Sequence, residues 1–347
     1  MPSPSLGIAG EGRGRLRVGA CLSLTGQYGR FGRQAAHALK VWRDLDRDAE
    51  LVLEDDRSDR VRLTDRLAWI ADRCDLLLGP YSSQLTRAAA RMAPGLDRLL
   101  WNHGGSADDV QGAGSHLMVS VPAPTSRYAL PFVRLAAQTP ARAPLWIVHG
   151  EESFGRQVAA GAERAGRKLG LDTVRVSLET PGWEDDRPAV WDLFSVGAFE
   201  DDVAVVTRAL NSRRPPRALC SVASGVRAFA ATVAEREGIY GVAQWFPGRG
   251  GVAELGPAED AFVERYAGRT GAMPDYPAAQ AFAAAVIAAH CARATGDLSV
   301  ETLWQAAVGL DTTTLFGAFR IDPQTGAQVG HDAILVRWTA EGLTAVA

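Results

Sequence analysis

The 347-residue chain has few cysteines and no cluster of metal-binding side chains. Its four cysteines, Cys21, Cys74, Cys220 and Cys291, lie far apart, and neither a C-x-x-C pair nor a group of histidines occurs. This spacing excludes the common zinc patterns and an evident disulfide framework. We therefore expect four buried free thiols, and neither a cofactor nor a metal.

An excess of charge of one sign is also missing. The chain has 40 acidic and 37 basic residues, which gives a net charge of −3. Lysine occurs only at Lys40 and Lys168, so 35 of the 37 basic residues are arginines, and these are interleaved with Asp and Glu. A nucleic-acid-binding protein concentrates positive charge on one surface. The sequence therefore predicts no nucleic-acid partner.

Long hydrophobic runs are absent as well. No apolar stretch approaches the roughly 20 residues that a membrane-spanning helix needs, so we expect no membrane span. The first residues, MPSPSLGIAGEGRGRLRVGAC, lack the apolar core of a secretion signal, and lipoprotein cleavage at VGAC would cut into the first predicted strand. We expect a cytoplasmic protein as the chain stands, or an extracytoplasmic one if an export signal was removed or the start is misassigned. Residues 1–14 are expected to form a flexible N-terminus.

The chain does have enough apolar residues for a large core, and these alternate regularly with polar ones. Hydrophobic residues make up 47% of the chain, and a single core stops growing near about 250–300 residues, so two lobes are expected. Strands are predicted at RLRVGACL, ELVLED, DLLLGP, RLLWN and HLMVSV, and again at APLWIVHG, DTVRVSL, PRALCSV and GVAQWF. Amphipathic helical segments separate many of them. This alternation predicts α/β architecture with doubly wound parallel sheets.

The remaining segments have their own signals. The stretch VPAPTSRYALP, with three prolines, predicts a crossover between the two blocks. A helix is predicted through Val226–Arg236, and residues 258–309 are expected to be mostly helical. The end of the chain predicts two strands joined around Asp322–Gly326.

Small hydroxyl residues follow one predicted strand of the first block. Ser82 and Ser83 lie between the strand DLLLG and a helix that begins near Leu85. In such sheets, ligands bind beyond the carboxyl ends of the strands, where helix N-termini face the crevice. A serine there either caps the helix or offers its hydroxyl to a ligand carboxylate. Capping is the favoured interpretation from this pattern alone.

The next strand, LLWN, ends in a second such segment. Gly104 and Gly105 allow a ligand to approach the backbone closely, and Ser106 faces the same crevice or caps a short helix. Aromatic residues near predicted strand ends either line a pocket or belong to the core. They are Tyr28, Phe31, Tyr81, Trp101, Phe154, Trp183, Trp245 and Phe246.

Signals for catalysis are weak. The HGG run suggests a hydrolase oxyanion loop, but no G-x-S-x-G nucleophile motif occurs. Asp55 and Asp56 end the second strand and could serve a metal or acid–base chemistry, yet no partner ligands are identifiable and a solvated turn is favoured. His290 and Cys291 lie in an apolar helical segment, where core packing is expected. The sequence therefore predicts a protein that is not an enzyme.

Five stretches together resemble the leucine-binding family of type I periplasmic solute-binding proteins, which serve ABC transporters of branched-chain amino acids and amides. They follow one another in family order over about residues 15–340: VGACLSLTGQYGRFGRQAAHALKVWRD, LVLEDDRSD, LLLGPYSS with NHGGSAD, HGEESFGRQVAAG, and FGAFRIDPQTGAQVGHDAILVRW. The resemblance implies two Rossmann-like lobes joined by three crossovers, which close on a ligand and catalyse nothing. The lobes are expected at 15–122 plus 253–314, and at 123–252 plus 315–347.

The resemblance also implies roles for particular residues. In the family, hydroxyl residues in the positions of Ser83 and Ser106 hold a ligand carboxylate, and the backbone near Gly104 accepts a hydrogen bond from the ligand's amino group. Aromatic residues in the positions of Phe31 and Phe154 form part of the pocket wall.

The resemblance departs from the family pattern in the second lobe. Amino-acid binders of the family hold the ammonium group with an acidic residue there, whereas here QWFPGRGG places Arg249 near that position and Glu254 is the next acid. An inward Arg249 would suit an anionic or neutral ligand, and an inward Glu254 would restore the usual chemistry. Ser224 stands for the family's second-lobe aromatic residue. The expected ligand-binding residues are Phe31, Tyr81, Ser82, Ser83, Gly104, Gly105, Ser106, Phe154, Ser224 and Arg249.

Two functions fit this resemblance. The first is the substrate-binding component of an ABC importer that binds a small amino-acid-like, amide or carboxylate solute and presents it to a permease. The second is a cytoplasmic ligand sensor on the same fold, similar to the regulator of amidase operons, whose partner is a regulatory protein. The closing strands resemble the transport branch, and the lack of an export signal and of a disulfide framework favours the sensor.

Overall fold

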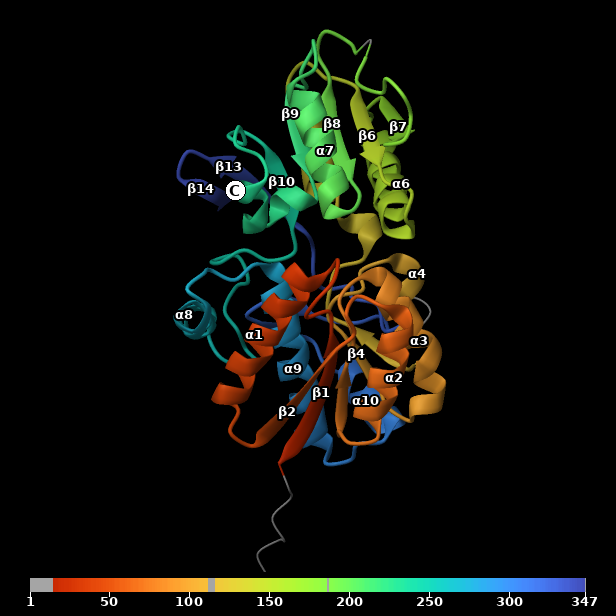
Figure 1. The fold of residues 1–347 in the computed structure, drawn as a ribbon, viewed down its shortest axis with the longest axis vertical. Helices are drawn as coiled ribbons and strands as arrows, with labels where there is room; N and C mark the ends of the chain where they lie inside the picture. Colours follow the sequence, from red (N-terminus) through yellow and green to blue (C-terminus); the bar gives the residue numbers. More distant parts are fainter. Residues whose placement is uncertain (1–14, 112–115, 186, 347) are drawn as a thin grey trace, which may run out of the picture.

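Two β-sheets divide the chain into an upper and a lower lobe (Figure 1). The computed structural model describes residues 15–111, 116–185 and 187–346. The predicted flexible segment 1–14 therefore lies outside the described residues. The expected fold class, α/β with two lobes built on largely parallel sheets, is confirmed.

Lobe 1, the lower lobe in Figure 1, is built on five parallel strands in the order β2-β1-β3-β4-β5. The strands are β1 (Leu16–Leu22), β2 (Ala49–Asp55), β3 (Leu76–Leu78), β4 (Leu100–Asn102) and β5 (Met118–Ser120). Helices from two distant parts of the chain accompany this sheet. They are α1 (Gly29–Leu45), α2 (Arg60–Ala71), α3 (Ser83–Leu96) and α4 (Asp108–Gln111), then α8 (Glu259–Thr270), α9 (Tyr276–Thr295) and α10 (Val300–Val308).

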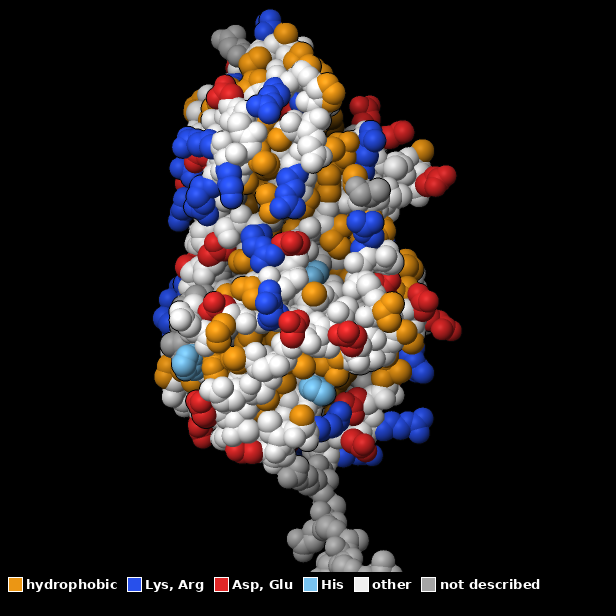
Figure 2. Space-filling view, turned by 180° about the vertical axis from the view of Figure 1, so that it is seen from behind, with side chains coloured by type: hydrophobic (Ala, Val, Ile, Leu, Met, Phe, Trp, Pro, Cys, Tyr) orange, Lys and Arg blue, Asp and Glu red, His pale blue; other side chains and the backbone are white. Residues whose placement is uncertain are grey.

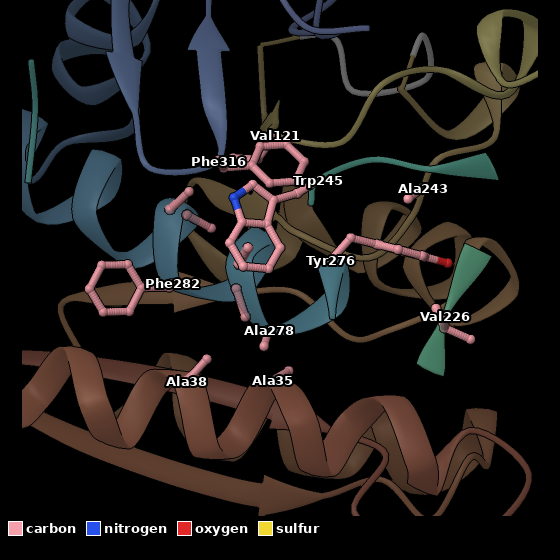
Figure 3. Close-up of a cluster of buried hydrophobic side chains, with 14 of the residues drawn as sticks. Ala35, Ala38, Val121, Val226, Ala243, Trp245, Tyr276, Ala278, Phe282 and Phe316 are labelled. Atoms are coloured by element: carbon pink, nitrogen blue, oxygen red, sulfur yellow. The ribbon is translucent and has the colours of Figure 1, made fainter. Parts of the chain in front are cut away.

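Helix α9 is the central helix of lobe 1. It packs against α1, β3 and β4, and its side chains are buried on all faces from its first residue to Ala289. A helix that is apolar all round belongs in a core. Figure 3 shows how small side chains allow the close approach of α1 and α9, with Ala35 and Ala38 facing Ala278. Cys291 is buried as expected, but His290 is exposed because it begins the last, solvent-facing turns.

Lobe 2 is built on a seven-stranded sheet in the order β14-β13-β10-β9-β8-β6-β7. Strands β6 to β10 run parallel, and β13 and β14 add an antiparallel edge. The strands are β6 (Leu145–His149), β7 (Thr173–Ser177), β8 (Asp192–Val196), β9 (Ala218–Ser221), β10 (Tyr240–Ala243), β13 (Ile334–Thr339) and β14 (Gly342–Ala345). The helices are α5 (Leu130–Gln138), α6 (Ser153–Lys168) and α7 (Phe199–Leu210).

The chain passes between the two lobes three times: after β5, after β10, and before β13. Gln244 connects these passages. Its side-chain oxygen accepts the N–H of Ala123 at 2.6 Å, and its main-chain oxygen accepts from Nε2 of His331 at 2.5 Å. Burial lowers the pKa of His331 to about 4, so this ring is neutral at physiological pH. Figure 3 shows the apolar part of the same region, where Trp245 lies between Tyr276 and Phe316.

Two expected elements differ from the structure. The predicted helix 226–236 is instead two short 3-10 turns, Ala223–Gly225 and Arg227–Ala231, because Gly225 lies directly against the backbone of β10 and Val226 is extended. The two closing strands do not pair with each other. β12 (Gly317–Phe319) pairs with β11 (Thr312–Thr314) in a separate hairpin, whereas β13 joins the sheet of lobe 2. The expectation of four buried free cysteines is confirmed.

Candidate ligand-binding site

A cavity of about 340 Å³ lies between the lobes. Lobe 1 contributes the loop after β1, the N-terminus of α3, the loop after β4 and the start of α9, and lobe 2 contributes the loops after β6, β8 and β9. These are the carboxyl ends of parallel strands in both sheets, where open α/β sheets bind ligands. The volume lies in the range typical of small-molecule pockets.

Three serines at the cavity, Ser82, Ser83 and Ser106, accept hydrogen bonds from different partners. Ser82 Oγ accepts the N–H of Leu85 at 3.3 Å and so caps α3. Ser83 Oγ accepts the N–H of Ala107 at 3.0 Å. Ser106 Oγ accepts from the hydroxyl of Tyr128 at 2.6 Å, and it also lies 3.3 Å from the amide nitrogen of Gln244.

The protons of two of these hydroxyls remain available to a ligand. All three serines line the cavity. In the part of the chain that the structure describes, neither Ser83 nor Ser106 donates a hydrogen bond. Both hydroxyls stand beside the N-terminus of α3, where free N–H groups and the helix dipole favour an anion. This side of the cavity is built to receive the acceptor oxygens of a ligand.

The two glycines after β4 have different surroundings. Gly104 lines the cavity, and a Cβ there would come within 2.6 Å of the Cα of Tyr81, so only glycine allows these two loops to meet. Gly105 does not line the cavity. A Cβ at Gly105 would lie 2.5 Å from the side chain of Thr86, so this glycine permits the packing of the loop onto α3. The expectation that Gly105 faces the ligand is therefore wrong.

Aromatic rings form much of the remaining wall. The ring of Phe31 stacks on Tyr81 with centroids 4.8 Å apart and meets Phe199 of lobe 2 at 6.4 Å. Phe154 packs edge-on against Tyr128 at 5.8 Å. The expected residues Phe31, Tyr81 and Phe154 all line the cavity, and so do four further aromatic residues that were not among them: Tyr28, Tyr128, Phe199 and Tyr276. Trp101, Trp183 and Trp245 are buried in the core instead.

One buried carboxylate lies on the lobe 2 wall. Asp202 of α7 accepts hydrogen bonds from Ser195 Oγ at 2.6 Å and from the N–H of Ala223 at 2.8 Å. These bonds hold it between the ends of β8 and β9. Burial raises the pKa of Asp202 to about 6. Among the described residues, no basic side chain lies within ion-pair distance of it.

The charge of the lining is negative. Of the described residues around the cavity, Arg87 is the only base, and its guanidinium already pairs with Asp109 at 2.6 Å. Asp201 and Glu152 add two further carboxylates on the lobe 2 side. Because a buried charge needs a partner, the wall around Asp202 favours a ligand that brings a positive group.

Both expected residues after β10 lie away from the cavity. Arg249 is exposed and does not line it. Glu254 is exposed too, and its carboxylate accepts the N–H of Thr313 at 3.0 Å. After β10 the chain enters the passage to lobe 1. Contrary to the expectation, Arg249 lies away from the cavity, and the buried acid of the lobe 2 wall is Asp202 near the start of α7.

The expectation for Ser224 is also wrong. Its hydroxyl is buried and donates to the main-chain oxygen of Tyr240 at 2.6 Å, which ties β9 to β10. Beside Phe154, lobe 2 presents a second aromatic residue to the cavity after β8, namely Phe199, three residues after the end of that strand. The pattern that could have found it is the segment VGAFEDD, in which glycine, an aromatic residue and acids follow a strand.

The acidic pair after β2 is structural. Asp55 accepts the N–H of Leu24 at 2.9 Å, and Asp56 accepts the hydroxyl of Ser23 and the N–H of Ser58, both at 2.7 Å. The predicted solvated turn is therefore wrong for Asp56, which is fully buried. These bonds shape the loop that carries Tyr28 and Phe31. No three potential metal ligands come together anywhere in the described ranges.

Contacts across the cleft hold the lobes together around the cavity. Arg30 of α1 pairs with Glu200 of α7 at 2.6 Å, and Gln157 of α6 accepts the N–H of Asp108 at 2.8 Å. These contacts join α1 and α4 of lobe 1 to α7 and α6 of lobe 2. On the face seen in Figure 2, acidic and basic side chains are mixed over both lobes.

The comparison with protein families agrees with this geometry. A model of the periplasmic binding proteins matches residues 15–342. The chain belongs to the periplasmic binding protein family. Members of this family bind solutes, and the two lobes with a cavity between them are its architecture. A search of curated proteins finds no sequence match.

Solved structures share the fold of this periplasmic binding protein at low sequence identity. A leucine-binding protein, LivK, from Thermotoga maritima is 15% identical, with a TM-score of 0.79 over 96% of this chain and 98% of that one. An ABC-transporter solute-binding protein from Rhodopseudomonas palustris, in complex with 3,4-dihydroxybenzoic acid, is 16% identical, with a TM-score of 0.78 over 96% of each chain. LivJ from Streptococcus pneumoniae, in complex with isoleucine, is 15% identical, with a TM-score of 0.77 over 95% and 99%.

The helices of this periplasmic binding protein give one further result. Within residues 15–111, 116–185 and 187–346, none is both long and apolar enough to cross a membrane. The central helix α9 has the length, at 20 residues, but its place is the core of lobe 1.

Proposed function

We propose that this periplasmic binding protein binds a small amino acid as the substrate-binding component of an ABC importer. One observation carries the proposal. The lobe 1 wall offers the hydroxyls of Ser83 and Ser106 to an anion, and the lobe 2 wall offers the buried carboxylate of Asp202 to a cation. A zwitterionic amino acid satisfies both walls in a single orientation.

The other expected ligand classes suit the cavity less well. A carboxylate without an amino group would occupy the serine side but leave Asp202 without a positive partner, beside two further carboxylates. A neutral amide would leave the same acid unpaired. Since an unpaired buried charge is costly, the acid decides between ligands that the serines alone would accept equally.

Structural relatives support both the ligand size and the transport role. Among proteins with this fold, the branched-chain amino acid transporter protein LivJ was solved with isoleucine, and an ABC-transporter solute-binding protein was solved with 3,4-dihydroxybenzoic acid. Contacts across the cleft between the described residues favour a closed arrangement of the lobes. Because closure around a ligand changes the surface of the protein, a membrane permease can bind the closed form selectively.

The proposal is tested with ligands that differ only in the amino group. Purified protein is unfolded and refolded to remove any carried ligand, and its thermal unfolding is then measured with isoleucine, phenylalanine and their deaminated analogues, 3-methylpentanoate and 3-phenylpropionate. A ligand at 100 times its dissociation constant stabilises the fold by about 2.7 kcal/mol, which is readily measured. We expect stabilisation by amino acids only. Equal or greater stabilisation by the deaminated acids would contradict the proposal.

A cytoplasmic ligand sensor on the same fold is the second candidate. One observation favours it: all four cysteines are free and buried, as is usual in a reducing compartment. The two candidates use the same cavity but place the protein on opposite sides of the membrane. Cell fractionation with detection of the native protein separates them, because an importer component is recovered outside the cytoplasmic membrane and a sensor inside it.

A further inference from the structure

Helix α9 contains one polar side chain that its surroundings do not explain. From Ala278 to Ala289 all the side chains are apolar except that of Gln280. Gln280 is only 1% exposed. An apolar residue would continue the buried pattern of this helix, so the amide must be accounted for by something other than packing.

The amide of Gln280 has no hydrogen-bond partner among the described residues. Its Nε2 atom is buried without a hydrogen bond, and its Oε1 atom accepts none from this part of the chain. Of the buried side-chain atoms that lack a partner in this part of the chain, Nε2 of Gln280 is the one that belongs to the cavity wall. The polar groups of Ser83, Ser106 and Asp202, by contrast, all have partners in the protein.

The position of Gln280 places it at the aromatic side of the cavity. It follows Tyr276 by four residues, so the two side chains share one face of α9. Figure 3 shows Tyr276 directed from the start of α9 towards Val226 of lobe 2, while Ala278 faces α1. Tyr276 and Tyr81 both line the cavity, and the ring of Tyr81 stacks on Phe31.

We infer that Gln280 recognises a hydrogen-bonding group on the side chain of the ligand. The inference rests on the proposed function, since it assigns the side-chain end of an amino acid whose two charged groups meet the serines and Asp202. The rings around Gln280 favour a flat side chain, and its amide can donate or accept. The ligand class is thus an amino acid with a flat side chain that ends in a ring hydroxyl or a carboxamide.

Matched ligand pairs test this inference. Tyrosine and phenylalanine differ by a ring hydroxyl, and glutamine and homoleucine differ by a carboxamide in place of an apolar branch of the same shape. Dissociation constants are measured by calorimetry for the wild type, for Gln280→Leu, and for the control Gln138→Leu, which makes the same change at an exposed residue at the end of α5, outside the cavity. If the protein prefers tyrosine to phenylalanine, Gln280 recognises a ring hydroxyl. If it prefers glutamine to homoleucine, Gln280 recognises a carboxamide.

We expect the wild type and Gln138→Leu to prefer the polar member of one pair by about tenfold or more, because the apolar member leaves the amide unpaired. Gln280→Leu should abolish this preference and bind the apolar member at least as tightly as the wild type does. The unliganded variant should unfold at the wild-type temperature or above it, because an unpaired buried amide is removed.

The outcomes separate this inference from the proposed function. If the wild type binds amino acids but does not prefer the polar member of either pair, or if Gln280→Leu keeps the preference, the role of Gln280 is refuted while the proposed function stands. If the wild type binds only deaminated acids or none of these compounds, the proposed function fails and the inference fails with it.

Discussion

Lobe 1 meets the cavity with two serine hydroxyls beside a helix N-terminus, whereas lobe 2 meets it with a carboxylate held between the ends of β8 and β9. Both lobes use the same structural position, the carboxyl ends of parallel strands, but they offer groups of opposite character. A helix N-terminus with free hydroxyl protons attracts an anion, and a buried carboxylate attracts a cation. Under the proposed function, the two lobes recognise different ends of one ligand, and this difference would fix its orientation.

The two walls also differ in how firmly their groups are held. Ser106 receives its hydrogen bond from Tyr128, and Gln244, which lies on the passage after β10, is bonded to the same pair. The serine wall is therefore connected to the hinge. Asp202 is braced only within lobe 2, by Ser195 and Ala223. Rearrangement of the hinge should disturb the anion side before it disturbs the cation side.

The variant with the largest expected effect is Asp202→Asn, which tests whether lobe 2 binds the cationic group of the ligand. The variant keeps the shape of the side chain but removes its charge, so the ammonium group of a bound amino acid loses its partner. We expect amino-acid binding to weaken by about 2–5 kcal/mol, the usual cost of truncating a buried charge pair, while binding of deaminated acids stays the same or improves. Isothermal calorimetry with isoleucine and 3-methylpentanoate measures both. An equal loss for both ligands would mean that Asp202 only supports the loops.

Ser83→Ala and Ser106→Ala test the opposite wall. Each removes one donor to a charged group, so we expect each to weaken ligand binding by about 1.5–3 kcal/mol for amino acids and deaminated acids alike. Ser82→Ala serves as the control. It removes the cap of α3 and should lower the free energy of unfolding by about 1 kcal/mol, with a smaller effect on affinity. If both cavity-facing variants bind normally, the anion-binding role of lobe 1 is wrong.

The pH dependence of stability should distinguish the walls as well. The pKa of Asp202 is raised from its ordinary value of 3.8 to about 6, so the folded state holds this proton more tightly than the unfolded state does. Its contribution to stability is fully present below pH 3.8 and is lost as pH rises through about 6. Denaturant titrations of the unliganded protein between pH 4 and 7 should show this loss in the wild type and not in Asp202→Asn. If the stabilities of the two proteins change in parallel with pH, the raised pKa of Asp202 is contradicted.

A matching effect on affinity should appear in the same pH range. The ionised form of Asp202 binds an ammonium group, so affinity for an amino acid should rise as pH increases through about 6, while affinity for a deaminated acid should fall or stay level. Calorimetric titrations at pH 5 and pH 7 measure the two trends. Identical trends for the two ligand types would contradict the assignment of the cation side to Asp202.

The smallest expected effect is at the rim, where the lobes contribute equally. Arg30 and Glu200 form an ion pair at 2.6 Å across the cleft, but the carboxylate is largely exposed. Exposed pairs contribute about 0–1 kcal/mol. Glu200→Gln should therefore weaken affinity less than threefold to fivefold, mainly through faster release in stopped-flow measurements. A loss as large as that of the cavity variants would show that rim closure, not the cavity, dominates binding.

Much of lobe 1 could be predicted from local sequence. Its strands end in short segments in which turn residues and hydroxyls follow an apolar run, as in LLLGPYSS and LWNHGGS, so Ser82, Ser83, Gly104 and Ser106 could be placed at one edge of a sheet. The aromatic residues Phe31 and Tyr81 of lobe 1, and Phe154 of lobe 2, also follow predicted strands and line the cavity. Gly105 could not be separated from Gly104, because only the packing of the loop onto Thr86 distinguishes them.

The acid and the closing strands could not be predicted in this way. Asp202 lies inside a helix, where an acid normally faces solvent, and only the close approach of the ends of β8 and β9 buries it. Arg249 and Glu254 lie near the expected position along the chain, but the path after β10 carries both away from the cavity. The closing strands separate because β12 pairs with its neighbour β11, whereas β13 pairs with the distant β10.

The sequence by itself determined the architecture, because hydrophobic periodicity and turn residues act locally and can be recognised in the sequence of each strand and helix. It also determined the hydroxyl-bearing loops of lobe 1. Only the tertiary structure decided the polarity of the cavity. Tyr276 and Gln280 of α9 are separated from Tyr81 and Ser106 by more than a hundred residues, and they meet these loops because α9 packs against β3 and β4. Asp202 of lobe 2 lies at the same cavity for a similar reason. Its burial depends on the arrangement of the strands in the sheet of lobe 2, which the local sequence does not determine.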